Sequence, residues 1–174
     1  MSKNKTFKIQ NEPKINNEFT NGLRDICQRR ASTISYMMDE AKKQGIDDSF
    51  ARKAIYRYGE DLGKEICEAM DDVTDMVEFS KYFGAAPHTD IYEMETIESD
   101  ENKLYIDFHY CPYVAEWVKQ GRTPEELDNL CDIAMEGDRA IGDAFPKFKF
   151  TLGRTIAQGH HVCEIRFDKV GDEE

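Results

Sequence analysis

The segment Asp107-x-His109-x-Cys111 concentrates side chains that could do chemistry. A cysteine attacks as its thiolate, and a nearby histidine lowers the pKa of the thiol. On a strand, side chains two residues apart share a face, so His109 and Cys111 would lie about 7 Å apart at the backbone. The pair could supply a nucleophile and an acid/base, or two metal ligands. Alternatively, His109 faces solvent and Cys111 is a small buried hydrophobic residue.

A second candidate pair, Cys131 and Asp138, lies in a stretch with helical periodicity. Seven residues make about two turns, so both side chains would share one helix face. The small Ala134 between them would leave space for a ligand. The alternative is that Cys131 belongs to the core and that Asp138 is a solvated charge near the helix end.

The last candidates follow a glycine turn at Gln158-Gly159. His160 and His161 are adjacent, so on a strand they point to opposite faces and at most one belongs to any one site. His161 shares a face with Cys163, Ile165 and Phe167, which favours a core position for Cys163. Two strand arginines, Arg154 and Arg166, could hold a substrate carboxylate through paired hydrogen bonds, or could be surface ion-pair partners.

The spacing of these residues assigns no metal site. Histidine, cysteine and aspartate all occur in the second half, but there is no CxxC and no HExxH. The sequence requires no cofactor and leaves zinc open. It also lacks the GxSxG elbow, the phosphate-binding GxxxxGK[ST] and the dinucleotide-binding GxGxxG.

We predict that the first half of the chain is helical, because its apolar residues recur at spacings of three and four. The first helix ends at Gly45, and its apolar face is Phe19, Leu23, Ile26, Cys27, Ile34, Met37, Met38 and Ala41. The second begins after Asp47 and Asp48, and its face is Phe50, Ala54, Ile55, Tyr58, Leu62, Ile66 and Met70. A shorter helix through Val73, Met76, Val77 and Phe79 stops near Gly84.

In the second half the apolar period changes to two, which indicates strands. Residues 91–97 and 104–111 predict a hairpin, and residues 148–152 and 160–167 predict another. Between them we expect a short helix over residues 113–120. A longer helix starts at Thr123-Pro124-Glu125-Glu126, a capping sequence, and runs toward Ile141. The fold class is therefore α+β: N-terminal helices, then two β-hairpins forming an antiparallel sheet with an intervening helix.

Length and composition limit the number of domains and the classes of partner that we expect. The length of 174 residues predicts a flexible N-terminal arm (1–16) and one domain (17–170), with a helical half (17–86) and a hairpin/helix half (88–170). The net charge of -12 argues against nucleic-acid or membrane partners. The polar start and the five scattered cysteines predict a cytoplasmic protein with free thiols. A homodimer is compatible with the general frequency of symmetric oligomers.

The second half carries a connected pattern: His109-Tyr110-Cys111-Pro112-Tyr113, Trp117, Gly121, Leu130-Cys131, Gly137-Asp138, Phe145-Pro146, Leu152 and Gly159-His160-His161-Val162-Cys163-Glu164-Ile165-Arg166-Phe167. In order and spacing this resembles the L-2-amino-thiazoline-4-carboxylic acid hydrolase family, best over residues 104–168. The resemblance implies a small-molecule substrate, a 2-aminothiazoline carboxylate or similar cyclic C=N compound, whose ring is opened by water.

The chemistry implied by this resemblance allows roles to be assigned. Cys111 would be the nucleophile or a ligand, His109 the acid/base, and Asp138 the group that stabilises a cationic amidine. Arg154 would hold the carboxylate, and the other candidate substrate-binding residues are Cys131, Trp117 and His161. The last predicted strand, with the pattern Gly159-x-x-x-Cys163-x-x-x-Phe167, also resembles the end of 4-vinyl reductase domains. This second resemblance implies an alternative function, a non-catalytic small-molecule-binding or sensor domain.

Overall fold

In the computed structural model, which describes residues 8–171, capping side chains set the starts of two of the first three helices. The side chain of Asn17 accepts a hydrogen bond from the amide of Thr20 and begins α1 (Glu18–Lys43). A short link with Gly45 at φ 70° leads to α2 (Ser49–Ala69). Asp75 caps α3 (Met76–Phe83). These three helices were predicted, whereas the short α4 (His88–Tyr92) was not.

The second half contains the predicted alternation of strands and helices. Its elements are β1 (Met94–Ser99), β2 (Lys103–Phe108), α5 (Pro112–Lys119), α6 (Pro124–Ala134), α7 (Glu136–Asp143), β3 (Phe148–Leu152), a 3-10 turn (Ile156–Gln158) and β4 (Cys163–Lys169). The capping box at the start of α6 is present, with Thr123 and Glu126 bonding each other's backbone amides.

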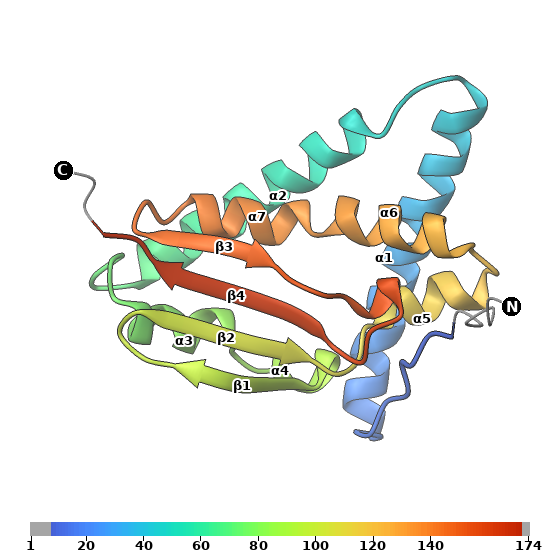
Figure 1. Ribbon diagram of the computed structural model, residues 1–174. Helices are drawn as coiled ribbons and strands as arrows, with labels where there is room; N and C mark the ends of the chain where they lie inside the picture. Colours follow the sequence, from blue (N-terminus) through green and yellow to red (C-terminus); the bar gives the residue numbers. More distant parts are fainter. Residues whose placement is uncertain (1–7, 172–174) are drawn as a thin grey trace, which may run out of the picture.

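One four-stranded antiparallel sheet unites the two hairpins, in the order β1-β2-β4-β3. The α+β prediction is therefore confirmed. Figure 1 shows α7 running beside β3 and α2 packed along α7, while α1 crosses one end of the molecule next to α5. Alternate residues of the central strands point into the core: Leu104, Ile106, Phe108, Cys163, Ile165 and Phe167 are buried.

Aromatic rings fill the space between the sheet and the helices. The ring of Phe79 on α3 lies 4.7 Å from Phe145, 5.3 Å from Phe148 and 5.0 Å from Phe167, centroid to centroid. Tilted and edge-on contacts at these separations are the favourable geometries for aromatic pairs. The cluster fixes α3 and the end of α7 against β3 and β4.

The predicted apolar face of α1 is wrong for three of its larger residues. Phe19, Ile26 and Met37 are exposed by 70%, 64% and 53%, although we placed them in the core. Arg24 is buried instead, and its guanidinium pairs with the buried carboxylate of Glu93 at 3.0 Å. A buried ion pair with further hydrogen bonds can take the place of apolar packing, and this one turns α1 about its axis relative to the predicted orientation.

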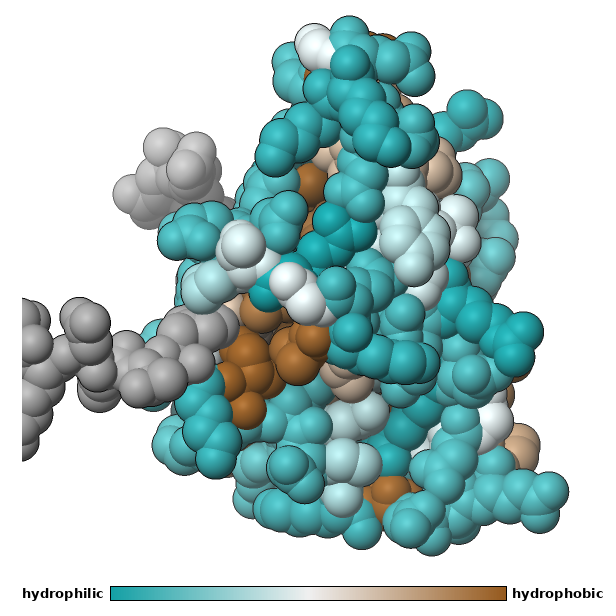
Figure 2. Space-filling model, turned by 90° about the vertical axis from the view of Figure 1, so that its right-hand side faces the viewer, coloured by the Kyte–Doolittle hydropathy of each residue, from teal (hydrophilic) through white to brown (hydrophobic). Residues whose placement is uncertain are grey.

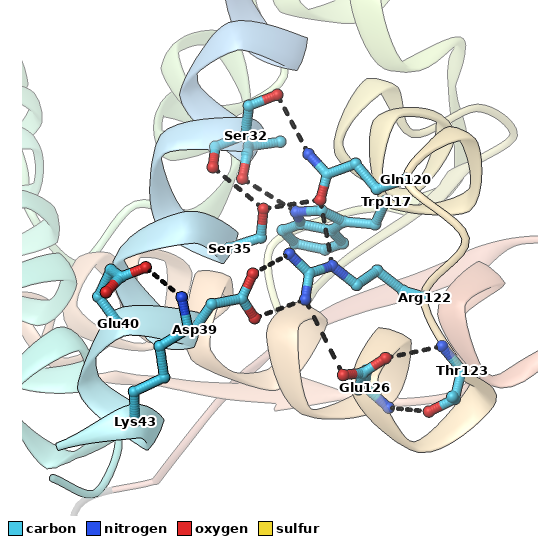
Figure 3. Close-up of polar contacts among 11 residues, drawn as sticks. Ser32, Ser35, Asp39, Glu40, Lys43, Trp117, Gln120, Arg122, Thr123 and Glu126 are labelled. Carbon is cyan, nitrogen blue, oxygen red and sulfur yellow. Dashed lines mark hydrogen bonds and ion pairs between the residues drawn. The ribbon is translucent and has the colours of Figure 1, made fainter. Parts of the chain in front are cut away.

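The face of α1 that packs on α5 is made of small and polar residues. The indole Nε1 of Trp117 donates to the carbonyl of Ala31 at 3.0 Å. Nearby, Arg122 donates to both carboxylate oxygens of Asp39, and Ser35 donates to Gln120 (Figure 3). The interface thus combines the buried indole of Trp117 with a network of hydrogen bonds to small and polar residues of α1.

Helices α2 and α7 approach closely through glycines. A Cβ built on Gly59 would collide with the backbone of Gly137, and one on Gly63 would lie 2.7 Å from the Cβ of Ala144. The long helix that we predicted from residue 124 toward residue 141 is interrupted at Met135. A guanidinium nitrogen of Arg139 bonds the carbonyl of Asp132 at this interruption.

The first described residues lie against the domain. The side chain of Asn11 donates to the carbonyl of Cys111 and accepts from its amide, both at 2.8 Å. The amides of Lys14 and Ile15 donate to the carboxylate of Glu93. Residues 8–16 of the predicted arm therefore make defined contacts, and residues 1–7 lie outside the described residues.

Figure 2 shows one face of the molecule, which is predominantly hydrophilic, with hydrophobic residues reaching the surface in small patches. Within residues 8–171, none of the helices has the length and apolar character required to cross a membrane.

Candidate functional site

A cavity of about 440 Å³ lies where α1, α2, α5, α6 and α7 meet the ends of β2 and β4. Most of its wall is aliphatic and aromatic, which is typical of small-molecule sites. Its polar lining includes Cys27, Arg30, Tyr113, Cys111 and Asp138.

Asp138, in the first turn of α7, is the carboxylic acid set deepest in this wall. Burial raises its pKa to about 6, although its own backbone amide and the charges of Arg139 and Arg30 oppose the rise. The rise reflects the cost of removing a carboxylate from water. The carboxyl has no hydrogen-bonding side-chain partner among the described residues, and it faces the cavity. It can therefore exchange a proton with a bound molecule near neutral pH.

Cys111 stands at the N-cap of α5, beyond the end of β2. Burial raises the pKa of its thiol to about 11, and the amides of Val114 and Tyr113 only partly offset this. Asn11 fixes the backbone of Cys111 from the other side. At pH 7 the thiol is therefore neutral, able to donate a hydrogen bond but not activated as a nucleophile.

Three more cysteines line the cavity. Burial raises the pKa of Cys27, Cys131 and Cys163 as well. All four cavity cysteines are free thiols. Over residues 8–171 the structure contains no group of three or more His, Cys, Asp or Glu side chains with the geometry of a metal site.

Arg30 supplies positive charge at the cavity mouth. Its guanidinium lies 4.3 Å from the centroid of the Tyr58 ring, and both residues line the cavity. Within the described part of the chain no carboxylate forms an ion pair with Arg30, in contrast to its neighbour Arg29, which pairs with Asp25. A cation of this kind, stacked on an aromatic ring, is suited to an anionic group of a ligand.

The seven residues predicted from the sequence separate into two groups. Cys111, Asp138, Cys131 and Trp117 come together in the cavity wall. Cys131 and Asp138 do so from two helices, α6 and α7, rather than from the single helix that we predicted.

The other three residues lie elsewhere. His109 does not share a face with Cys111, because β2 ends at Phe108 and the chain then turns into α5. The imidazole of His109 lies 2.8 Å from the carboxylate of Glu95. Arg154 pairs with Glu164 outside the cavity at 2.6 Å, and lowers the pKa of that carboxyl to about 2. His161 is exposed and precedes β4.

Sequence reasoning missed Cys27, Arg30, Tyr58, Tyr92 and Tyr113, which also line the cavity. One signal was present: Cys27 and Arg30 lie one turn apart on α1, so they are neighbours on the helix surface. Burial raises the pKa of Tyr92 and of Tyr113, so both phenols are neutral hydrogen-bond donors.

Comparison with known proteins identifies the family. The sequence model of the L-2-amino-thiazoline-4-carboxylic acid hydrolase family matches residues 25–167, so the chain belongs to this family, and the match extends into the helical half. No curated protein matches the chain. A crystal structure of a trafficking protein particle complex subunit 3 from Naegleria fowleri, covalently bound to palmitic acid, is similar with a TM-score of 0.54 and 14% identity. The alignment covers 85% of this chain and 97% of that one, and the likeness shows the fold.

Proposed function

From its membership of this family, we propose that the protein hydrolyses a small cyclic amidine such as L-2-amino-thiazoline-4-carboxylate in the cavity around Asp138. One observation carries the proposal: a carboxyl with a pKa of about 6 faces a largely apolar cavity. General acid–base catalysis works best when the pKa of the catalytic group lies near the operating pH.

In this proposal Asp138 is ionised at pH 7 and accepts a proton from water. The water oxygen then forms a bond to the carbon of the protonated, cationic amidine, and the C=N electrons move onto its nitrogen. As the tetrahedral intermediate collapses, the new hydroxyl becomes a carbonyl and releases its proton to solvent. The bond from that carbon to the ring nitrogen or sulfur breaks, and Asp138 returns the first proton to the leaving atom. The apolar wall supports this sequence because it keeps the carboxylate poorly hydrated.

Arg30 would hold the substrate carboxylate, in place of Arg154. It lies at the cavity mouth, and its guanidinium has no carboxylate partner within residues 8–171. Arg154 is already engaged by Glu164 at the surface. A ring bound with its carboxylate at Arg30 would turn its amidine toward Asp138, since both residues line the same cavity.

Cys111 keeps a place in the proposal as a neutral donor near the reacting carbon. The alternative is the nucleophilic role that the residue types first indicated, with a thiolate attacking the amidine carbon. A pKa of about 11 disfavours that role in the free protein. We leave His109 and His161 out of the mechanism because neither lines the cavity.

The test is hydrolysis of L-2-amino-thiazoline-4-carboxylate by the purified protein and by Asp138→Asn, with Asp143→Asn as the matched control on the same helix. Asp143 is exposed and bonds Tyr56, so its variant should retain activity. We expect Asp138→Asn to lose at least about 100-fold in kcat. Equal turnover by the two variants would refute the role of Asp138.

A second pair of variants separates binding from chemistry. Arg30→Gln should raise KM, because it removes a contact to a part of the substrate that does not react. Arg29→Gln is the control, since the Arg29 side chain is 80% exposed and pairs with Asp25. Loss of activity in Cys111→Ser, with Asp138→Asn still active, would favour the thiolate mechanism instead.

A second candidate is ligand binding without catalysis. The observation that favours it is the predominance of aliphatic and aromatic side chains in the cavity wall. The trafficking protein particle complex subunit of similar fold is bound to palmitic acid. Native mass spectrometry of the purified protein would reveal a retained ligand, and a retained apolar molecule together with no turnover would support this candidate.

A further inference from the structure

Large apolar side chains stay exposed along α1, the following link and α2. We call this surface the α1–α2 stripe. Its members are Phe19 (70% exposed), Ile26 (64%), Tyr36 (56%), Met37 (53%), Ile46 (49%), Tyr58 (43%) and Phe50 (36%). Single exposed apolar residues are ordinary on a protein surface, whereas several gathered together mark an interaction site. Here Tyr36, Met37, Ile46 and Phe50 line one groove, and Ile26 and Tyr58 both line the cavity.

The stripe exists because α1 and α2 each pack against a different partner. The inner face of α1 lies on α5, and that of α2 lies on α7. The two helices diverge from their link, which Figure 1 shows at the upper right. At the link they enclose an open apolar groove, in which Tyr36, Met37, Ile46 and Phe50 take part.

On α1 the stripe follows one line of the helix. Phe19, Ile26 and Met37 are separated by seven and eleven residues, and both spacings return to nearly the same angle. Since 26 residues of helix span about 39 Å, the line is long enough for a second helix to lie along it.

The size of the stripe fits a dimer interface. Side chains of these types have full areas of about 150–250 Å², so at the exposed fractions above the seven present roughly 700 Å². A stable interface takes about 800 Å² from each partner. Flanking polar residues would supply the remainder.

The charge distribution favours a second copy as the occupant. The whole chain has a net charge of -12, so most surfaces of two copies repel each other. Helix α1 is an exception, because it holds five basic and four acidic residues. Two copies can therefore meet at α1 without the like-charge repulsion that would act elsewhere.

We propose that the protein forms a two-fold symmetric homodimer through the α1–α2 stripe, and that each copy thereby covers the mouth of the other's cavity. Ile26 and Tyr58 belong both to the stripe and to the cavity lining, so a copy bound on the stripe would also lie over the cavity. Two-fold symmetry presents the same patch from both copies, so one self-complementary surface is sufficient.

The test is sedimentation velocity of the full chain at several concentrations between about 1 and 100 μM, with dissociation constants fitted for wild type and variants. Met37→Glu and Phe50→Glu place a charge in the stripe from two different elements. Each should weaken dimerisation by at least about 100-fold, because burying an unpaired charge is costly. Val77→Glu, on α3, is the matched control, since Val77 is 40% exposed and lies outside the stripe.

The possible outcomes each decide the proposal. A wild-type dimer that persists in Val77→Glu and dissociates in a stripe variant with an unchanged circular dichroism spectrum supports it. Having two stripe variants keeps the test decisive if one of them fails to fold. A monomeric wild type at 100 μM, or a dimer that both stripe variants leave intact, would overturn it. Neither result depends on turnover, so the proposed hydrolysis is tested separately.

Discussion

The raised pKa of Asp138 predicts a pH-dependent gain of stability when this carboxyl is replaced by an amide. A carboxyl whose pKa is higher in the folded than in the unfolded chain takes up a proton on folding, so the stability of the folded protein falls as the pH rises between the two values. For Asp138 that window runs from 3.8 to about 6. Above it, the ionised wild-type carboxylate destabilises the fold.

The size of the effect follows from the shift. About two pKa units at roughly 1.4 kcal/mol each give about 3 kcal/mol at pH 7, which falls to about 0.5 kcal/mol at pH 4. Asp138→Asn has nearly the same shape and cannot ionise. It should therefore raise the free energy of unfolding by up to about 3 kcal/mol at pH 7, relative to its effect at pH 4.

Urea unfolding of wild type and Asp138→Asn at pH 4, 5, 6, 7 and 8 measures this difference directly. Asp143→Asn serves as the control on α7, because its side chain is exposed and no burial acts on it. If the stability difference between wild type and Asp138→Asn is the same at pH 4 and pH 7, the carboxyl is not desolvated as described, and its role as an acid/base near neutral pH loses its basis.

Three further predictions concern packing and ion pairs. Gly59→Ala should destabilise the protein by about 1–3 kcal/mol or more in urea unfolding, because its Cβ would meet the backbone of α7. Gly22→Ala is the control: a Cβ there has open space, so the variant should be neutral or more stable by up to about 1 kcal/mol. Arg24→Met should cost about 3–5 kcal/mol by the same assay, since it leaves a buried carboxylate without its cation; a loss below about 1 kcal/mol would contradict the burial. Arg154→Gln should move the pKa of Glu164 from about 2 toward 4.5 in an NMR titration, and the wild-type pair should stabilise the fold above pH 4.5 and lose that contribution as the pH falls toward 2.

Local sequence signals predicted much of the fold. The capping sequence at Thr123 is confirmed, and so is the burial of alternate residues in β2 and β4. Both signals depend on residues close in sequence. The orientation of α1 depends instead on the pairing of Arg24 with Glu93, which are 69 residues apart. Arginine and glutamate are usually exposed, so the sequence did not indicate that these two are buried together. The exposed line of Phe19, Ile26 and Met37 is the result.

The candidate site was predictable where a residue type was unusual for its surroundings. Cys111 and Asp138 were selected for their chemistry, and both face the cavity. His109 was selected by extending the alternation of β2 past its end, where the rule no longer applies because the backbone turns into α5. Arg30 was missed because, in sequence, it is one of several arginines on a polar helix; only tertiary structure places it over Tyr58 at the cavity mouth.

The position of β4 has a consequence for how the protein is made. β4 comes after β1, β2 and β3 in the chain, yet it lies between β2 and β3, and it carries Cys163 into the cavity wall. On the ribosome, β3 therefore has no strand to pair with until residues 163–169 have emerged. During that interval β3 presents unpaired backbone N–H and C=O groups to which another strand could bond, which is the hazard of any exposed strand edge.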